Sequence, residues 1–451
     1  MHINDQRTTP GLEALGPFFD DVSAIIGDAN ISRDSLSGAL VGPEGQTSYD
    51  DPYCVGTDHQ PSGAVRPQTV EEVQEVIRIA NKHRVPLWTV SRGKNLGYGG
   101  SAPVVSGTIV LDLQRMKKII DINEKYGYAI VEPGVSFFDL YEEIQRRGLH
   151  LWPSVPAIAD KKVLGVVTKL GIHITPAPEA YSSAELDVPH EEDLGVLIEI
   201  LSDLMRRSII LNSPSIANSF RIAMTSGVPE VQGELSKYMK PGSCVPYEVL
   251  DRIQAEQGWG FWRAYFSLYG SVEMIPALKK TIQWAFNAVP DVQIRWRDFA
   301  GTEGQPIKAA DIKEEEIPHA GIPTLAPLGL IGTHMYPWYL AAKEMTLAAG
   351  FDFFADFHVF PRYVNAIELV IYTLPEEKEA MGLYERLLVD ATERGYMEYR
   401  THVKFMDKIS GKLDFNESAF PRLLSRLKDT LDPNGILAPG KSGIWNSPKS
   451  S

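Results

Sequence analysis

The chain has 451 residues, more than one ordinary hydrophobic core holds, so two domains are expected. Hydrophobic residues make up 44% of the chain and charged residues 23%, which is typical of a folded globular protein. The formal net charge of −14 argues against a nucleic-acid partner, because binding to a phosphate backbone requires a basic surface.

Cysteine usage and apolar patterning indicate the compartment. The two cysteines, Cys54 and Cys244, cannot build a disulfide framework, which favours a reducing environment. The first residues lack the basic and apolar regions of a signal peptide. No apolar run approaches the roughly 20 residues that span a bilayer. We therefore expect a cytoplasmic protein with no membrane partner.

Apolar periodicity predicts an α+β unit in the first part of the chain. An amphipathic piece lies near 15–26. Thr69 and Glu72 form a capping box before a helical stripe over 70–80. A second box, Ser136 and Asp139, opens a helix that ends near residue 148. Short apolar runs predict strands at 86–90, 108–113, 118–122 and 128–131.

The pattern changes after residue 152. Strands are expected at 166–174, 262–269 and 293–299, with two more within 351–372 around Pro361 and Arg362. Helices are expected at 194–205, 275–289, 376–395 and 420–431. This order predicts a sheet with an antiparallel strand pair and helices on one side.

Residues 91–101, SRGKNLGYGGS, concentrate glycine in one loop. Glycine permits positive φ, so the backbone N–H groups of residues 93–100 can point into one concavity and hold a pyrophosphate. No helix follows the loop, which excludes a Rossmann or a P-loop motif, because both require a helix N-terminus next. On composition alone, a glycine-rich hairpin loop is the alternative interpretation.

Two later stretches also carry polar groups of interest. Tyr399 and Arg400, in EYRTH, can bind an anionic oxygen through a hydroxyl and a guanidinium. A surface turn is the alternative, and a structural role is the preferred interpretation of the neighbouring His402. The stretch DPNGILAPGKSGIW, which contains Lys441, reads by itself as a helix stop and a turn.

Taken together, these stretches resemble the vanillyl-alcohol oxidase and 4-cresol dehydrogenase family of FAD-linked oxidoreductases. The resemblance is carried by KNLGYGGSAP, YGYAIVEPGVSFFDLY, EYRTH and DPNGILAPGKSGIW, which follow one another in the family's order. It implies an α+β fold with a PCMH-type FAD-binding domain and a cap domain with an antiparallel sheet. The expected boundaries are 1–160 for the FAD-binding domain, 161–404 for the cap, and 405–451 for the return to the first domain.

The resemblance also implies the site residues. Tyr98, Tyr399 and Arg400 match the family's catalytic positions, which bind a phenol oxygen and lower its pKa. A hydride then leaves the benzylic carbon for flavin N5. The implied FAD-binding residues are Arg92, Gly93, Lys94, Asn95, Gly97, Gly99, Gly100, Ser101 and Lys441. The implied partners are a small aromatic substrate, molecular oxygen or another electron acceptor, and further copies of the chain; aromatic secondary metabolism is a plausible setting.

The chain also departs from the family pattern. Ala157 stands where the family has an acidic residue beside the flavin, and a long glycine-rich segment is missing near residues 159–161. Asn365 and Ala366 replace two histidines, one of which often tethers FAD, so noncovalent FAD is expected. The missing segment leaves two alternatives open: a degenerate, non-catalytic relative, or an incomplete gene model of an ordinary oxidase.

Overall fold

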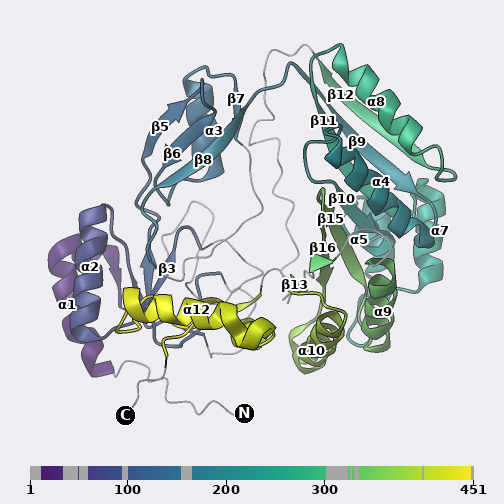
Figure 1. Cartoon of the computed structure of the whole chain (residues 1–451). Helices are drawn as coiled ribbons and strands as arrows, with labels where there is room; N and C mark the ends of the chain where they lie inside the picture. Colours follow the sequence, from purple (N-terminus) through teal and green to yellow (C-terminus); the bar gives the residue numbers. More distant parts are fainter. Residues whose placement is uncertain are drawn as a thin grey trace. The chain divides into compact units, whose positions relative to one another are not determined.

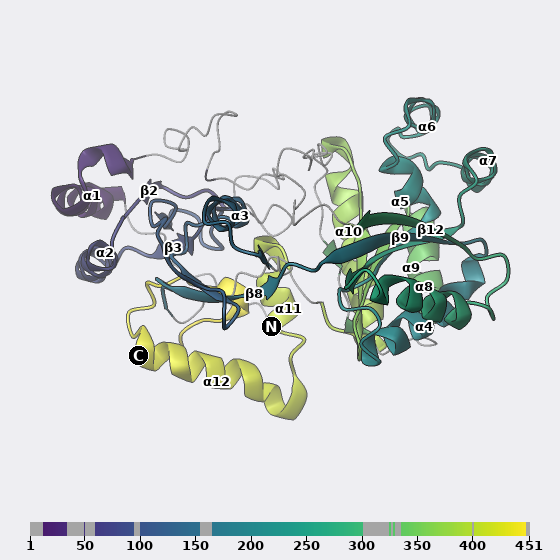
Figure 2. The ribbon, with the colours of Figure 1, turned by 90° about the horizontal axis from the view of Figure 1, so that it is seen from above.

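The computed structural model describes residues 12–33, 49, 59–93, 100–153, 165–300, 324–325, 328–329, 335–398 and 401–447. The chain divides into two compact units (Figures 1 and 2). Unit 1 comprises Met1–Ala177 and Thr401–Ser451, and unit 2 comprises Pro178–Arg400. Each unit has its own sheets and core. None of the described helices combines the length and the apolar character needed to cross a bilayer.

A four-stranded sheet with three parallel strands forms the first half of unit 1. Its strands are β1 (Ile31–Ser32), β2 (Gly63–Val65), β4 (Ile109–Asp112) and β3 (Leu87–Val90), in that spatial order. β2, β4 and β3 are parallel, and β1 is antiparallel to β2. All residues of β2, β3 and β4 are buried, which explains why their sequences are continuous apolar runs rather than alternating ones.

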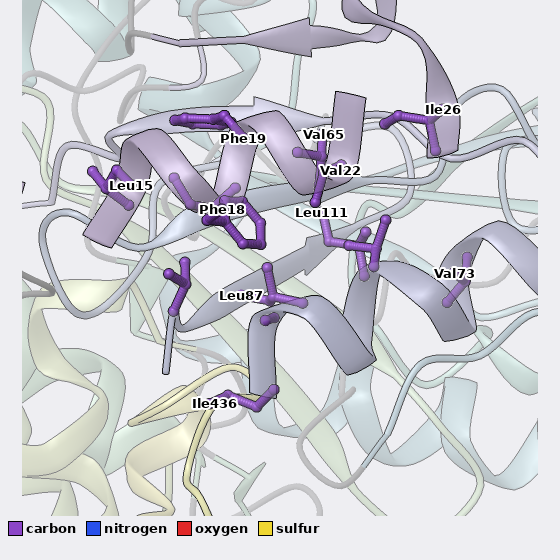
Figure 3. Close-up of a cluster of buried hydrophobic side chains, with 14 of the residues drawn as sticks. Leu15, Phe18, Phe19, Val22, Ile26, Val65, Val73, Leu87, Leu111 and Ile436 are labelled. Atoms are coloured by element: carbon purple, nitrogen blue, oxygen red, sulfur yellow. The ribbon is translucent and has the colours of Figure 1, made fainter. Parts of the chain in front are cut away.

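Two helices bury one face of this sheet. They are α1 (Leu12–Ile26) and α2 (Val70–His83). Leu15, Phe18 and Val22 of α1 join Val73 and Val76 of α2 in one core over the strands (Figure 3). α2 begins as predicted, because the Thr69 hydroxyl accepts a hydrogen bond from the Glu72 backbone N–H.

A second sheet of unit 1 is antiparallel, with strands in the order β5 (Ile119–Asn123), β6 (Tyr128–Val131), β8 (Leu170–Pro176) and β7 (Leu151–Pro153). α3 (Phe137–Arg146) packs Leu140 and Ile144 onto it. The predicted capping box is present in full, since Ser136 and Asp139 bond each other's backbone N–H groups.

β8 corrects one sequence-based expectation. We expected a strand at 166–174 within the cap domain, but β8 pairs with β6 and β7 and lies in unit 1. The reason is cross-strand packing: Ile172 lies opposite Ala129, and Ile174 joins the core that α3 covers. The sequence of a strand shows which residues alternate between its two faces, but it does not show which strand it pairs with.

The C-terminal part of the chain returns to unit 1. It contains α11 (Met406–Ser410) and α12 (Phe415–Leu431). After α12, Leu87 of β3 donates its N–H to the Ile436 carbonyl at 2.7 Å and accepts the Ala438 N–H at 2.7 Å. The two ends of the chain are therefore joined by backbone pairing, and unit 2 is inserted between them.

Unit 2 is built on one antiparallel sheet. Its strands follow the order β12, β9, β11, β10, β15, β16 and β13, and β14 also pairs with β16. The bounds are β9 Ala180–Val188, β10 Ser215–Asn218, β11 Trp262–Gly270, β12 Gln293–Ala300, β13 Thr324–Leu325, β14 Leu328–Gly329, β15 Phe354–Val359 and β16 Val364–Leu369. The two strands predicted around Pro361 and Arg362 are β15 and β16.

Helices pack on both faces of this sheet, not on one as expected. One group comprises α4 (Leu194–Arg206), α8 (Met274–Ala285), α9 (Met335–Ala348) and α10 (Glu377–Glu393), and the other α5 (Ser219–Met224), α6 (Pro229–Leu235) and α7 (Tyr247–Gln257). Figure 2 shows α4 and α8 on one side of β9 and β12 and α6 and α7 on the other. The second group packs there against an apolar patch formed by Phe354 and its cross-strand neighbour Leu369, on a face that elsewhere carries charged and polar residues.

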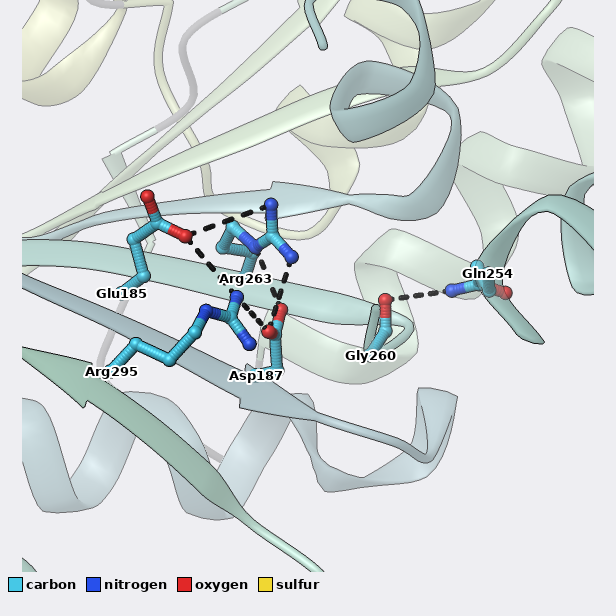
Figure 4. A network of polar contacts seen from close by, with 6 residues as sticks. All are labelled: Glu185, Asp187, Gln254, Gly260, Arg263 and Arg295. Atoms are coloured by element: carbon cyan, nitrogen blue, oxygen red, sulfur yellow. Dashed lines mark hydrogen bonds and ion pairs between the residues drawn. The ribbon is translucent and has the colours of Figure 1, made fainter. Parts of the chain in front are cut away.

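A buried ion cluster connects three strands of that polar face (Figure 4). Both oxygens of Asp187 on β9 accept hydrogen bonds from Arg263 on β11, at 2.7 and 3.1 Å. Arg295 on β12 donates to the same carboxylate. Because Asp187 is almost fully buried, this pairing is required to hold its charge, and it fixes the register of the three strands.

Glu368 on β16 is a buried carboxyl group in the core of unit 2. It is 1% exposed, and Thr346 of α9 donates a hydrogen bond to its Oε1. Its Oε2 has no hydrogen-bond partner among the described residues. Burial raises the pKa of Glu368 to about 8, so the folded chain holds this group protonated at neutral pH.

We predict that Glu368→Gln stabilises the protein progressively as pH rises. The folded state keeps a proton that the unfolded state loses above pH 4.5, so wild-type stability falls between pH 4.5 and about 8. The slope is about 1.4 kcal/mol per pH unit. Urea unfolding at several pH values should therefore give equal stabilities at pH 4 and a more stable Gln variant at pH 8. A difference that does not change with pH would contradict the assignment.

Candidate functional site

The carboxyl ends of the three parallel strands of unit 1 bring polar groups together at one edge. Arg66 follows β2, Arg92 and Gly93 follow β3, and Asp112 ends β4. Strands that run in parallel end at the same edge, which is where open α/β sheets bind ligands.

The two described ends of the glycine loop lie against each other. Gly93 has φ +63°, and a Cβ built on it would lie 2.0 Å from the Ser101 Oγ. Gly100 also has positive φ, at +55°. The described ends of the loop, residues 93 and 101, therefore meet at a narrow neck, and the positive φ of residue 93 favours glycine there.

A second glycine carries a neighbouring segment to the same edge. A Cβ on Gly134 would lie 2.6–2.7 Å from the carbonyl oxygens of Leu113, Gln114 and Met116, which follow β4. Arg92 donates from Nη1 to the Gly134 carbonyl at 3.3 Å, and the same Nη1 lies 3.7 Å from Asp139 Oδ2. The segments after β4 and β6 thus pack backbone to backbone, and the Arg92 side chain connects the segment after β3 to them.

A buried polar cluster lies beside this edge. Tyr49 donates to Asp112 Oδ2 at 2.7 Å, and the Gln114 N–H donates to Asp112 Oδ1 at 2.8 Å. Arg66 donates to the Tyr49 hydroxyl and to Ser32. Burial raises the pKa of Asp112, while Tyr49 opposes that rise. The hydrogen bond between Tyr49 and Asp112 connects residue 49 of the N-terminal segment to the end of β4.

The C-terminal segment contributes Lys441. Its side chain is 4% exposed, and its Nζ lies 4.8 Å from the centre of the Trp88 ring on β3. The preceding Gly440 has φ +76°, and a Cβ there would clash with Trp445 and Val104. This close packing fixes the lysine over the face of the sheet that Trp88 and Val90 share.

The structure thus brings together Arg92, Gly93, Gly100 and Ser101 at the neck of the loop, and holds Lys441 over Trp88. The other predicted site residues lie outside the described residues: Lys94, Asn95, Gly97, Tyr98, Gly99, Tyr399 and Arg400. His402 is buried, and its Nδ1 accepts the Lys404 N–H at 3.3 Å, a capping contact that agrees with a structural role.

Sequence reasoning missed Gly134 and the Tyr49–Asp112 pair. Gly134 lies within a quoted motif, EPGVS, but its role depends on three carbonyl groups that only the fold assembles. Tyr49 and Asp112 are 63 residues apart, so no local pattern could pair them.

Comparisons with known proteins agree with this geometry. Residues 61–174 match the FAD binding domain family. The flavoprotein subunit of 4-cresol dehydrogenase [hydroxylating] from Pseudomonas putida is 28% identical over 478 residues, covering 86% of this chain and 88% of that protein. Over most of its length the chain is similar to members of the vanillyl-alcohol oxidase and 4-cresol dehydrogenase family, in agreement with the resemblance of its motifs. Its cofactor is FAD.

Solved structures support the same family fold. The 4-ethylphenol oxidase from Gulosibacter chungangensis, in complex with isoeugenol, superposes with a TM-score of 0.83 at 24% identity, covering 98% of this chain and 99% of that one. A p-cresol methylhydroxylase with substrate bound gives 0.79 at 25% identity, covering 96% and 97%. The expected α+β, PCMH-type fold is therefore confirmed.

The alignment with the Pseudomonas subunit also has a length difference. It extends over 478 positions, more than the whole of this chain, although it uses only 86% of it. The Pseudomonas subunit therefore contains residues with no counterpart here.

The described residues fit a dinucleotide cofactor. At the neck, Gly93 and Gly100 both have positive φ, a backbone conformation in which successive N–H groups can point to one side and bind a pyrophosphate. Arg92 supplies a cation at the same edge and is 38% exposed. These residues would hold the FAD phosphates.

We predict that Gly93→Ala lowers the FAD content of the purified protein severalfold. Alanine at this position meets both the φ penalty of about 1 kcal/mol and the contact with Ser101. Gly148→Ala is the matched control, because Gly148 has a similar φ of +65° but open space around it. Protein-bound flavin absorbance measures the effect. Equal flavin loss in both variants would contradict a specific role for the neck.

Proposed function

We propose that this family member oxidises a phenolic substrate by removing a hydride from the carbon attached para to the hydroxyl group. The observation that supports this most is the likeness over almost the whole chain to proteins named for 4-cresol and 4-ethylphenol. The bound FAD supplies the hydride acceptor. The protein must bind the phenol, favour its anion and orient it.

The proposed phenol-binding residues are Tyr98, Tyr399 and Arg400, which the family resemblance assigns. A guanidinium and two hydroxyl groups favour a phenolate over a phenol, which lowers the phenol's pKa. The negative charge on oxygen then increases electron density at the para position and so favours loss of the hydride. Arg92, Gly93, Gly100 and Ser101, with the other residues of the loop, hold the cofactor phosphates in this proposal.

We predict that Arg400→Ala lowers kcat/KM for 4-ethylphenol by about 10²–10³, the usual cost of removing a group that stabilises a developing oxyanion. FAD content should stay unchanged, because the proposal gives Arg400 a role toward the substrate alone. Stopped-flow reduction and flavin absorbance separate the two effects. Parallel loss of flavin and activity would contradict this role.

FAD is proposed to be held noncovalently, because Asn365 and Ala366 offer no histidine for a tether. Acid precipitation should release the flavin into the supernatant. A yellow pellet would instead indicate a covalent bond to another side chain.

A non-catalytic relative is the second candidate. It is favoured by the residues of the Pseudomonas protein that have no counterpart here, and by Ala157 at the position expected to be acidic. A visible spectrum of the purified chain separates the candidates. One FAD per folded chain supports the enzyme, and a folded, colourless protein supports the relative. For the enzyme alone, we propose that oxygen or another redox partner accepts the electrons. Self-association is likewise proposed only for the enzyme.

A further inference from the structure

Asp112 is a buried carboxylate at the carboxyl end of β4, beside the neck of the glycine loop. It is 0% exposed, although burying a charged carboxylate costs free energy unless hydrogen bonds compensate for it. Burial raises the pKa of Asp112, and the hydrogen bond from Tyr49 is the largest influence that opposes this rise. The Arg92 guanidinium opposes the rise in pKa as well, so its charge acts on this carboxylate. A group that is buried at such a cost is a candidate for a role beyond packing.

The side chain of Asp112 fixes the turn that follows β4. Its Oδ1 accepts the Gln114 N–H at 2.8 Å, a contact in which an aspartate bonds the backbone two residues further on and so holds a turn. The Leu113 N–H donates to the Val90 carbonyl of β3 at 3.0 Å, and the Met116 N–H donates to the Leu113 carbonyl at 3.0 Å. These bonds hold the carbonyl groups of residues 113, 114 and 116 in one place.

These three carbonyl groups surround Gly134. A Cβ at that position would lie 2.6–2.7 Å from each of their oxygens. The Gly134 N–H also donates to the Met116 carbonyl at 2.8 Å. Because the contact is backbone against backbone, a shift of the turn must move Gly134 with it. The position of Gly134 therefore depends on the turn that Asp112 holds.

The Gly134 carbonyl in turn holds the side chain of Arg92. Arg92 Nη1 donates to this carbonyl at 3.3 Å and lies 3.7 Å from Asp139 Oδ2. Both contacts involve Nη1, and a guanidinium has further donors on Nε and Nη2 that can bind a phosphate. Arginine is a long side chain with many rotamers, so a side chain that is already ordered loses less entropy when it binds a ligand.

We propose that Asp112 is a positioning residue for cofactor binding: through the turn after β4 and the Gly134 carbonyl, it orients the Arg92 guanidinium toward the FAD phosphates. This inference rests on the proposed function, because that proposal gives Arg92 its role toward the phosphates. Every residue on this path belongs to unit 1. The path assigns a function to a buried carboxylate that itself touches neither cofactor nor substrate in this proposal.

Equilibrium dialysis of the full-length protein against FAD, with bound flavin measured by absorbance, tests the proposal. Asp112→Ala should raise the Kd for FAD about 10-fold, the cost of one misplaced charge-assisted hydrogen bond. Asp112→Asn should stay within about 2-fold of the wild type, because its amide oxygen still accepts the Gln114 N–H. Thr108→Val is the matched control and should keep the wild-type Kd. It removes the buried hydrogen bond from Thr108 Oγ1 to the Val105 carbonyl, 2.7 Å long, at the opposite end of the same strand.

A double variant separates positioning from general structural damage. Arg92→Ala alone should raise the Kd, and adding Asp112→Ala should raise it by no more than about 2-fold further, because two residues that act through one contact are not additive. If the alanine variant at position 112 does not fold, Asp112→Ser repeats the comparison with a smaller and weaker acceptor.

The outcomes distinguish this inference from the proposed function. A wild-type Kd in Asp112→Ala, a Kd in Asp112→Asn as weak as in Asp112→Ala, or a further 10-fold loss in the double variant overturns the inference alone. An Arg92→Ala variant that binds FAD like the wild type contradicts the role given to Arg92, and the inference with it. A wild type that binds no FAD overturns the proposed function and the inference together.

Discussion

The proposed cofactor site depends on a conformational constraint at one edge of a small parallel sheet. The chain leaves β3 at Gly93, whose φ of +63° favours glycine, and a Cβ there would meet the Ser101 hydroxyl at 2.0 Å. Gly134, enclosed by three carbonyl oxygens, brings the segment after β6 to the same edge. Together the two contacts bring backbone from three loops to one place. Close approach to a pyrophosphate requires backbone N–H groups, which the positive φ of Gly93 and Gly100 allows the loop after β3 to present.

The second requirement is that both ends of the chain build the same unit. Backbone bonds between Leu87 and the 436–438 segment extend the parallel sheet with residues that follow α12. Asp432 stabilises that turn, because it accepts the N–H groups of Ile436 and Leu437 and pairs with the buried Lys428. This turn leads directly to Lys441 over Trp88. Folding of the cofactor-binding unit therefore depends on contacts between residues more than 300 apart in sequence.

Local sequence signals predicted local structure well. The residues that cap α2 and α3, and the buried runs of β3 and β4, were recognisable because their physical causes lie within a few residues. The placement of β8 was wrong because strand pairing depends on partners such as Ala129 and Leu151, which are remote in sequence. Helices on the polar face of the unit 2 sheet were missed for a similar reason, since the apolar patch that they cover, Phe354 beside Leu369, forms only when β15 and β16 pair. In the candidate site, glycine content predicted the loop, but not that Ser101 closes it, nor that Gly134 and Asp112 lie beside it.

The central claim is that this chain holds FAD and passes electrons to it from a phenol. Anaerobic mixing of the purified, FAD-loaded protein with 4-ethylphenol tests this most directly, with the visible flavin band recorded against time. The account predicts that the band bleaches at a rate that rises with phenol concentration, and that it returns when an electron acceptor is admitted. A flavin-replete protein whose band stays unchanged in excess phenol would contradict it.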